Sequence, residues 1–240
     1  MSLAVVIPTL NEEAALPGLF DSLKRQSAPA KRVVVADGGS SDGTAEVARR
    51  HGAAVVAAPG RGRGGQVAAA LSEVSEKIIL VAHADMRLPE DALVAIRNWL
   101  ADHPECPGGC LGHRFDRRAL ALRLIEWFDA RRAWRGESYG DQGQFFQVEG
   151  LRSAGGFPDQ PIMEDIELSR RLRSLGKSAY LDVPVVVSSR RFERLGWARV
   201  LWNNWWLRRR YRREGLVAYR DLYGSYYGET GDTIRNCSRT

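Results

Sequence analysis

The stretch Ile78-Ile79-Leu80-Val81-Ala82-His83-Ala84-Asp85 decides the fold prediction for this sequence. Five apolar residues are followed at once by an imidazole and, two residues later, by a carboxylate. A strand that is apolar throughout is buried on both faces, which is typical of the middle of a mostly parallel sheet. In open α/β sheets, ligands bind beyond the carboxyl ends of the strands. We therefore expect His83, Ala84 and Asp85 to bind a ligand, although an exposed polar turn explains the same residues.

Three further strands are predicted in the first hundred residues, and helical patterns separate the four. The expected strands cover residues 3–8, 32–36, 54–57 and 77–82. The first expected helix is amphipathic, with Asn11 as its cap and Glu12 and Glu13 in its first turn. The other expected helices cover residues 45–50, 66–74 and 90–100. Repeated βαβ units with right-handed crossovers predict a three-layer α/β/α sandwich with a mostly parallel central sheet.

The second half of the chain loses this regular alternation. Expected strands cover residues 109–115, 144–148 and 180–187, and expected helices cover 118–134, 163–175 and 197–213. Pro184 predicts an edge strand or a bend. We expect a single domain over residues 1–240, with a nucleotide-binding half (1–105), an acceptor half (106–195) and a helical extension and tail rich in Trp and Arg (196–240).

Composition favours a soluble protein with anionic partners. Apolar residues make up 44% of the 240-residue chain and charged residues 27%, and the net charge is +6. Such a charge suits nucleotides, phosphorylated metabolites, nucleic acid or an acidic membrane surface. The three cysteines show neither zinc-site spacing nor a disulfide framework, and a reduced Cys106 and Cys110 are expected. No apolar run approaches the ~20 residues that span a bilayer, so we expect a cytoplasmic protein, peripheral at most on the inner membrane face.

Two loops that follow the first two strands are candidates for binding a nucleoside. The first supplies Pro8, Thr9, Asn11 and Glu12, and the second supplies Asp37 and Gly38. Glycines in the second loop allow the backbone to approach a ligand closely, and Asp37 can accept hydrogen bonds from a base or a ribose. A helix cap and a surface turn are the structural alternatives.

A glycine- and arginine-rich loop at residues 60–66 is a candidate for binding a diphosphate. Arg63 precedes a helical pattern that begins at Gln66, and guanidinium groups and free N–H groups both suit phosphates. Asp85 could add a divalent ion, because Mg²⁺ is usually held by one or two carboxylates plus substrate phosphates. A flexible surface loop and an RNA contact are the alternatives for this segment.

The remaining candidates lie in the second half. Glu164 and Asp165 begin a helix, where acids favour the helix dipole, and a pocket would make Asp165 a general base. Five further residues could bind an acceptor or a phosphate, namely Asp141, Gln142, Arg190, Arg191 and Arg194. A polar turn explains the first two equally well, and a basic turn explains the three arginines. The helix at 197–213 mixes Trp with Arg; we favour packing of its aromatic residues onto the domain over an interfacial membrane helix.

Taken together, these motifs resemble family 2 glycosyltransferases of the GT-A fold. The matching residues, in order, are Val6–Glu13, Asp37–Thr44, Arg63 with Gln66, His83-Ala84-Asp85 and Glu164-Asp165. The resemblance implies that the first two motifs hold a nucleoside, usually uridine, that Asp85 binds Mg²⁺ or Mn²⁺, and that Asp165 deprotonates the acceptor. The chain departs from the family pattern at His83, where an Asp is usual.

A narrower resemblance is to a compact bacterial subgroup associated with arsenic- and selenium-containing sugars, the selenosugar synthases. It is carried by Gly140–Gly143, Gly155–Pro158, Pro161–Asp165 and Ser189–Arg191. It implies a donor of the UDP-N-acetylglucosamine type and selenophosphate as acceptor, with a carbon–selenium bond formed. Arg190, Arg191 and Arg194 could bind this anion. Because the Gly- and Arg-rich loop occurs once, between folded elements, we expect no nucleic-acid partner. A hydroxyl acceptor, a nucleotidyltransferase and a non-enzymatic binding module are the alternatives, and the oligomeric state stays open.

Overall fold

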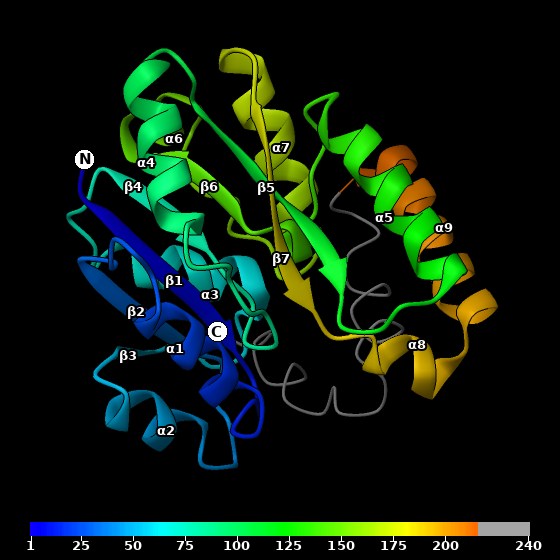
Figure 1. Cartoon of the computed structure of the whole chain (residues 1–240), viewed down its shortest axis with the longest axis horizontal. Helices are drawn as coiled ribbons and strands as arrows, with labels where there is room; N and C mark the ends of the chain where they lie inside the picture. Colours follow the sequence, from blue (N-terminus) through cyan, green and yellow to red (C-terminus); the bar gives the residue numbers. More distant parts are fainter. Residues whose placement is uncertain (216–240) are drawn as a thin grey trace.

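The computed structural model describes residues 1–215 of the chain, without the side chains of Arg191 and Arg194. A seven-stranded sheet forms its centre, with the strand order β3-β2-β1-β4-β6-β5-β7 (Figure 1). The strands are β1 (Leu3–Thr9), β2 (Arg32–Asp37), β3 (Ala54–Ala57), β4 (Ile78–Val81), β5 (Gly108–Phe115), β6 (Gln144–Gln147) and β7 (Ala179–Val187).

Only β6 runs against its neighbours in this sheet. It pairs antiparallel with both β4 and β5, whereas the β1–β2, β1–β4, β2–β3 and β5–β7 pairs are parallel. The other six strands therefore share one direction, and their carboxyl ends lie at the same edge of the sheet. The chain that leads into β6 also arrives at this edge, which brings residues of both halves of the sequence together.

Helices cover both faces of the sheet and make the expected three layers. They are α1 (Leu16–Lys24), α2 (Thr44–Arg50), α3 (Gly62–Leu71), α4 (Ala92–Asp102), α5 (Leu120–Ala133), the 3-10 turn η1 (Gly140–Gln142), α6 (Val148–Ser153), α7 (Glu164–Leu175), α8 (Arg190–Leu195) and α9 (Trp197–Glu214). Alternation along β1 divides the core: Val5 packs with α1, α2 and α4, and Val6 packs with α3, α6 and α7. The predicted α/β fold class is confirmed.

Several local predictions were wrong. Helix α1 begins at Leu16 and has no acid in its first turn; Asn11 has a left-handed backbone (φ 55°), and a turn at residues 13–15 precedes the helix. Helix α3 begins at Gly62, so the expected loop at 60–65 is partly helical. A Cβ on Gly64 would lie 2.1 Å from the Gln160 carbonyl oxygen, which explains why glycine stands there. The short helices α6 and α8 were not predicted, whereas β7 is an edge strand as Pro184 indicated.

The aromatic residues of α9 were expected to be packed onto the domain, and most are not; α5 is exposed in the same way. In α5 only Leu122 and Ala133 are buried, and Trp127 is 56% exposed. In α9 the buried residues are Val200 and Leu207, while Trp202 is 63% exposed. Both helices lie at the rim of the molecule, beyond β5 and β7 (Figure 1).

Two further expectations can be compared with the structure. Cys106 and Cys110 are both buried and free. Within residues 1–215, none of the helices combines the length and the apolar character needed to cross a bilayer. The predicted tail beyond residue 215 lies outside the described residues.

Candidate active site

The loops after β1 and β2 are joined by hydrogen bonds at the carboxyl edge of the sheet. The Asn11 side chain accepts from the Ser41 N–H at 2.8 Å, and the Glu12 N–H donates to Thr44 Oγ1 at 2.9 Å. Glu13 accepts from the Gly43 N–H at 2.9 Å. The two loops predicted to bind a nucleoside therefore form one connected surface.

Asp37, Gly38 and Gln66 meet at the end of β1. Asp37 accepts hydrogen bonds from the backbone N–H groups of Gly39 and Ser40. Gln66 donates to the Thr9 carbonyl at 3.2 Å, and a Cβ on Gly38 would lie 2.0 Å from Gln66 Nε2. A side chain at position 38 would therefore displace the Gln66 amide from the Thr9 carbonyl, whereas Pro8 lies within β1, opposite Ala36.

Arg63 is held by Glu164, which links the donor half of the site to the acceptor half. Arg63 Nε lies 2.8 Å from Glu164 Oε1. Burial raises the pKa of Glu164 to about 7, although the Arg63 guanidinium acts in the opposite direction. Arg61 is engaged elsewhere, with Nη2 2.7 Å from Asp159 Oδ2.

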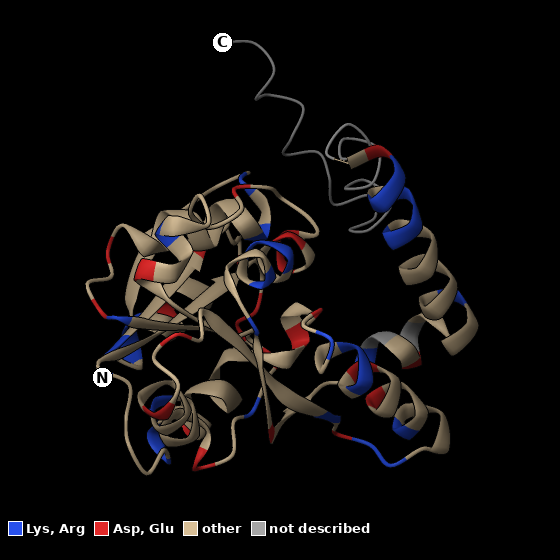
Figure 2. Cartoon of the chain, turned by 90° about the horizontal axis from the view of Figure 1, so that it is seen from above, with Lys and Arg blue, Asp and Glu red and all other residues tan. Residues whose placement is uncertain are grey.

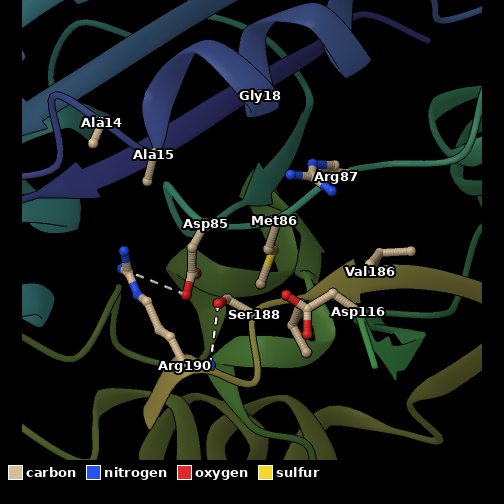
Figure 3. A pocket seen from close by; sticks show the side chains of 11 residues that line it. Ala14, Ala15, Gly18, Asp85, Met86, Arg87, Asp116, Val186, Ser188 and Arg190 are labelled. Atoms are coloured by element: carbon tan, nitrogen blue, oxygen red, sulfur yellow. Dashed lines mark hydrogen bonds and ion pairs between the residues drawn. The ribbon is translucent and has the colours of Figure 1, made fainter. Parts of the chain in front are cut away.

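Asp85 lies between two cavities and faces Arg190 (Figure 3). Arg190 Nη2 is 3.7 Å from Asp85 Oδ2 and 3.1 Å from Glu12 Oε2. Burial raises the pKa of Asp85, and Arg190 opposes that shift. Arg190, expected near the acceptor, therefore contacts residues predicted to bind the nucleotide and the metal. The side chains of Arg191 and Arg194 lie outside the described part of the chain.

A divalent ion fits the chemistry of Asp85. The carboxylate is partly exposed and lines a cavity of about 200 Å³, although the Arg190 guanidinium faces it. One carboxylate with substrate phosphates suffices for Mg²⁺ or Mn²⁺. His83 beside it is a neutral imidazole, because burial lowers its pKa to about 3, with a contribution from Arg63. Ala84, the residue between them, is buried.

Asp165 lies at the start of α7, next to His83 and η1. Its carboxylate accepts from the Gly140 N–H at 2.9 Å and from the Ile166 N–H at 2.8 Å. A Cβ on Gly140 would lie 2.6 Å from His83 Nε2 and 3.6 Å from Asp165 Oδ2. Gly140 therefore permits the close approach of an imidazole from the end of β4 and a carboxylate from α7.

Asp141 and Gln142, both predicted to bind the acceptor, differ in their positions. Asp141 lines the larger cavity. Gln142 is fully buried; its Oε1 accepts from the Tyr139 N–H at 3.1 Å and from Arg132 Nη2 at 3.2 Å. Gln142 thus holds the turn that presents Asp141.

The larger cavity has a volume of about 660 Å³ and joins both halves of the predicted site. Its polar end carries Arg63, His83, Asp85, Asp141 and Asp165. Its walls come from α5, α8 and α9 and are largely apolar, with residues such as Leu124, Ile125, Phe128, Phe192, Val200 and Leu201. This arrangement can receive a molecule with a polar end and an apolar remainder.

Sequence reasoning missed several polar residues of this cavity. Arg132 lies over the Tyr139 ring, 3.4 Å from its centroid, and Arg208 hydrogen-bonds the Tyr139 hydroxyl. Arg132 and Arg208 lie far apart in sequence and outside the matched motifs, so no local pattern indicated that both reach this cavity. Figure 2 shows further Lys and Arg positions toward the end of α9, which include Arg209, Arg210, Arg212 and Arg213.

Comparison with known proteins decides the family. The model of glycosyl transferase family 2 matches residues 4–152, more than half of the chain. The chain belongs to glycosyl transferase family 2. The matched segment contains all predicted nucleotide-binding residues, and Asp165 lies beyond it.

Curated relatives match only part of this family member. An uncharacterized glycosyltransferase of Mycobacterium tuberculosis is 41% identical over 85 residues, which are 35% of this chain and 37% of the relative. The succinoglycan biosynthesis protein ExoA of Rhizobium meliloti is 51% identical over 47 residues, 19% of this chain and 14% of that protein. The chain thus matches well under half the length of either relative.

Solved structures support the GT-A fold. The mannosyltransferase PcManGT of Pyrobaculum calidifontis, in complex with GDP-mannose and Mn²⁺, has a TM-score of 0.68 at 23% identity, covering 94% of this chain and 69% of that one. TarS of Staphylococcus aureus with UDP-GlcNAc has a TM-score of 0.61 at 17% identity, covering 79% and 59%.

Proposed function

We propose that this family 2 enzyme transfers a sugar from a UDP-sugar, of the UDP-N-acetylglucosamine type, to an acceptor bound in the larger cavity. The observation that supports this proposal most directly is that Asp85 and Asp165, from the two halves of the chain, line the same cavity. The uridine would lie against Thr9, Asp37 and Gln66, where backbone and side-chain groups converge. TarS supports the choice of donor, because that protein was solved with UDP-GlcNAc.

The positions of Asp85, Arg63 and Asp165 suggest a role for each in the transfer reaction. Mg²⁺ or Mn²⁺, held by Asp85, would neutralise charge on the departing diphosphate. Arg63, fixed by Glu164, supplies positive charge from the start of α3. Two backbone N–H groups orient Asp165 at the cavity, where it would take a proton from the acceptor. Attack opposite the leaving group gives inversion at the anomeric carbon.

The preferred acceptor is selenophosphate, supported by the sequence resemblance to selenosugar synthases. Selenium would bond to the anomeric carbon as the bond from that carbon to UDP oxygen breaks. Cations at the cavity suit an anionic acceptor, and they include Arg63, Arg132 and Arg208. A selenium nucleophile is already ionised, so Asp165 would then position the acceptor more than deprotonate it.

A hydroxyl acceptor with an apolar part, such as a lipid, is the second candidate. It is favoured by the apolar walls of the cavity and by the exposed Trp127, Phe128 and Trp202 on the two flanking helices. Aromatic residues beside arginines suit a membrane interface, so segment Trp197–Arg213 would contact the membrane peripherally in this case. A small anion such as selenophosphate would not require the apolar walls of the cavity.

The deciding experiment measures UDP release with UDP-N-acetylglucosamine and Mg²⁺, with and without selenophosphate, and detects the product by mass spectrometry. Selenophosphate-dependent release with a selenium-bearing sugar is expected. Asp165→Asn should then lose little activity, whereas a hydroxyl acceptor predicts a loss of about 10²–10⁴-fold. Asp102→Asn, an exposed residue on α4, is the matched control. No UDP binding at all would contradict the proposed function.

The apolar walls have their own test. Ala121 is exposed and lines the cavity, so Ala121→Trp adds bulk there without repacking the core. For a lipid acceptor, the KM of the acceptor should rise while UDP binding is unchanged. Ala101→Trp, on the exposed face of α4, should change neither. An unchanged acceptor KM in Ala121→Trp would contradict the lipid candidate.

A further inference from the structure

An imidazole and two carboxylates converge beside the larger cavity, and the two carboxylates line it. His113 comes from β5, Asp129 from α5 and Asp141 from η1. One potential ligand atom from each lies within 4.8 Å of the others. Three separate elements thus bring three metal-binding side chains to one point.

Two polar atoms of this cluster have no hydrogen-bond partner within residues 1–215. The His113 side chain is only 1% exposed, and within the described residues neither its Nε2 nor Asp141 Oδ1 has a hydrogen-bond partner. Buried polar atoms are nearly always satisfied, so each exception requires an explanation. A bound cation would satisfy both atoms at once.

The spacing within the cluster suits two ligands of one ion better than a hydrogen bond. His113 Nε2 lies 3.6 Å from Asp129 Oδ2, too far for a good hydrogen bond. Two ligand atoms that each lie about 2.0–2.2 Å from a tetrahedral Zn²⁺ are roughly 3.3–3.5 Å apart. Only a small movement of either side chain would bring both atoms onto one ion.

A neighbouring cation fixes the orientation of one carboxylate. Arg132 pairs with Asp129 Oδ1, which leaves Oδ2 as the oxygen directed at His113. Arg132 also donates to Gln142, the neighbour of Asp141. Carboxylates that ligate metals are commonly held by such outer hydrogen bonds. The positive charge of Arg132 is therefore already engaged on the far side of Asp129.

We propose that His113, Asp129 and Asp141 bind a divalent transition-metal ion such as Zn²⁺ or Mn²⁺, separate from the ion expected at Asp85. An imidazole among the ligands favours these ions over Mg²⁺. Three protein ligands leave at least one position for another group. Since Asp129 and Asp141 line the larger cavity, this group would be an anionic or hydroxyl oxygen of the acceptor. That last assignment rests on the proposed function, whereas metal binding does not.

The test is metal binding by the full chain, freed of metal with a chelator and kept without donor and acceptor. Zn²⁺ is titrated by calorimetry, and Co²⁺ is titrated by its visible absorption, which reports nitrogen and oxygen ligation. We expect one equivalent to bind, and His113→Gln should weaken this binding by about a hundredfold or more. His103→Gln should bind like the wild type, because His103 stacks on Trp99 and takes no part in the cluster. Asp85→Asn should also retain this equivalent.

A second variant keeps the test valid if His113→Gln does not fold. Asp141→Asn changes one atom at the cavity wall and should weaken Zn²⁺ binding similarly, with thermal unfolding confirming the fold. The proposal is overturned if no ion binds, or if both variants bind as tightly as the wild type. Binding that only Asp85→Asn abolishes would also overturn it. A chain that binds Zn²⁺ through His113 yet never releases UDP would contradict the proposed function alone.

Discussion

Arg190 faces Asp85 across the narrow space at the end of β4, with Nη2 3.7 Å from Oδ2 (Figure 3). The same guanidinium lies 3.1 Å from Glu12. Two carboxylates predicted to serve the donor thus share one cation from the acceptor half. A divalent ion at Asp85 would have to compete with this cation or displace it.

Replacement of Arg190 should strengthen metal binding. In Arg190→Gln the competing charge is absent, so the affinity for Mn²⁺ in the presence of UDP should rise about two- to fivefold, as suits an exposed pair. Turnover should fall if Arg190 also contacts a phosphate. Mn²⁺ titrations of UDP binding measure the first effect, and Arg97→Gln, on α4, serves as control. Weaker Mn²⁺ binding in Arg190→Gln would show that Arg190 does not compete.

Removal of the Asp85 charge should abolish most activity. Asp85→Asn should reduce UDP release by about a hundredfold or more, because metal-ion stabilisation of the departing diphosphate contributes several kcal/mol. Raised Mn²⁺ concentrations should recover only part of the rate. Asp102→Asn provides the comparison, and full activity of Asp85→Asn at low Mn²⁺ would exclude Asp85 as the metal residue.

Gly140→Ala tests the contact between His83 and Asp165. The added Cβ would lie 2.6 Å from His83 Nε2, so His83 or η1 must move and the Asp165 hydrogen bond must change. A displacement of about 1 Å can cost roughly a hundredfold in rate, so kcat should fall by that order while UDP binding persists. At Gly176 a Cβ would meet nothing closer than 3.7 Å, which makes Gly176→Ala the control. Equal kcat values for the two variants would contradict this role.

The raised pKa of Glu164 predicts a pH dependence of stability. This carboxyl group has a folded pKa of about 7 against an ordinary value of 4.5. The folded state therefore holds a proton that the unfolded state releases between about pH 4.5 and pH 7, and stability falls as the pH rises through this window. Glu164→Gln should lack this contribution. The Tm of the wild type should therefore fall relative to the Tm of the variant as the pH rises from 4.5 to 7.

Thermal unfolding at several pH values checks this prediction. Glu149→Gln, an exposed residue on α6, should keep the pH dependence of the wild type. Because the Glu164→Gln substitution also removes the carboxylate that faces Arg63, the slope with pH is the informative quantity rather than the Tm at one pH. Parallel Tm curves for wild type and Glu164→Gln would be inconsistent with a raised pKa.

The sequence predicted the parts of the structure that depend on local patterns. Apolar runs such as Ile78–Val81 marked the strands, and the residues after them, such as Asp37 and Asp85, were correctly expected at the edge of the sheet. Contacts between segments that are distant in sequence could not be predicted from such local patterns. Arg190 and Glu12 are 178 positions apart in sequence, and their contact depends on how the loop after β1 and the start of α8 lie relative to each other. The exposure of Trp127 and Trp202 likewise depends on where α5 and α9 lie relative to the sheet.

The single reversed strand β6 has a practical consequence for protein engineering. Because every site-bearing loop emerges at one edge, the opposite edge is free to carry foreign sequence. The connection between α4 and β5 lies there, and Pro104 and Glu105 within it are exposed. A fluorescent tag or an affinity peptide grafted between them would report on the enzyme from the side away from its substrates. The same connection offers a place to open the chain for circular permutation.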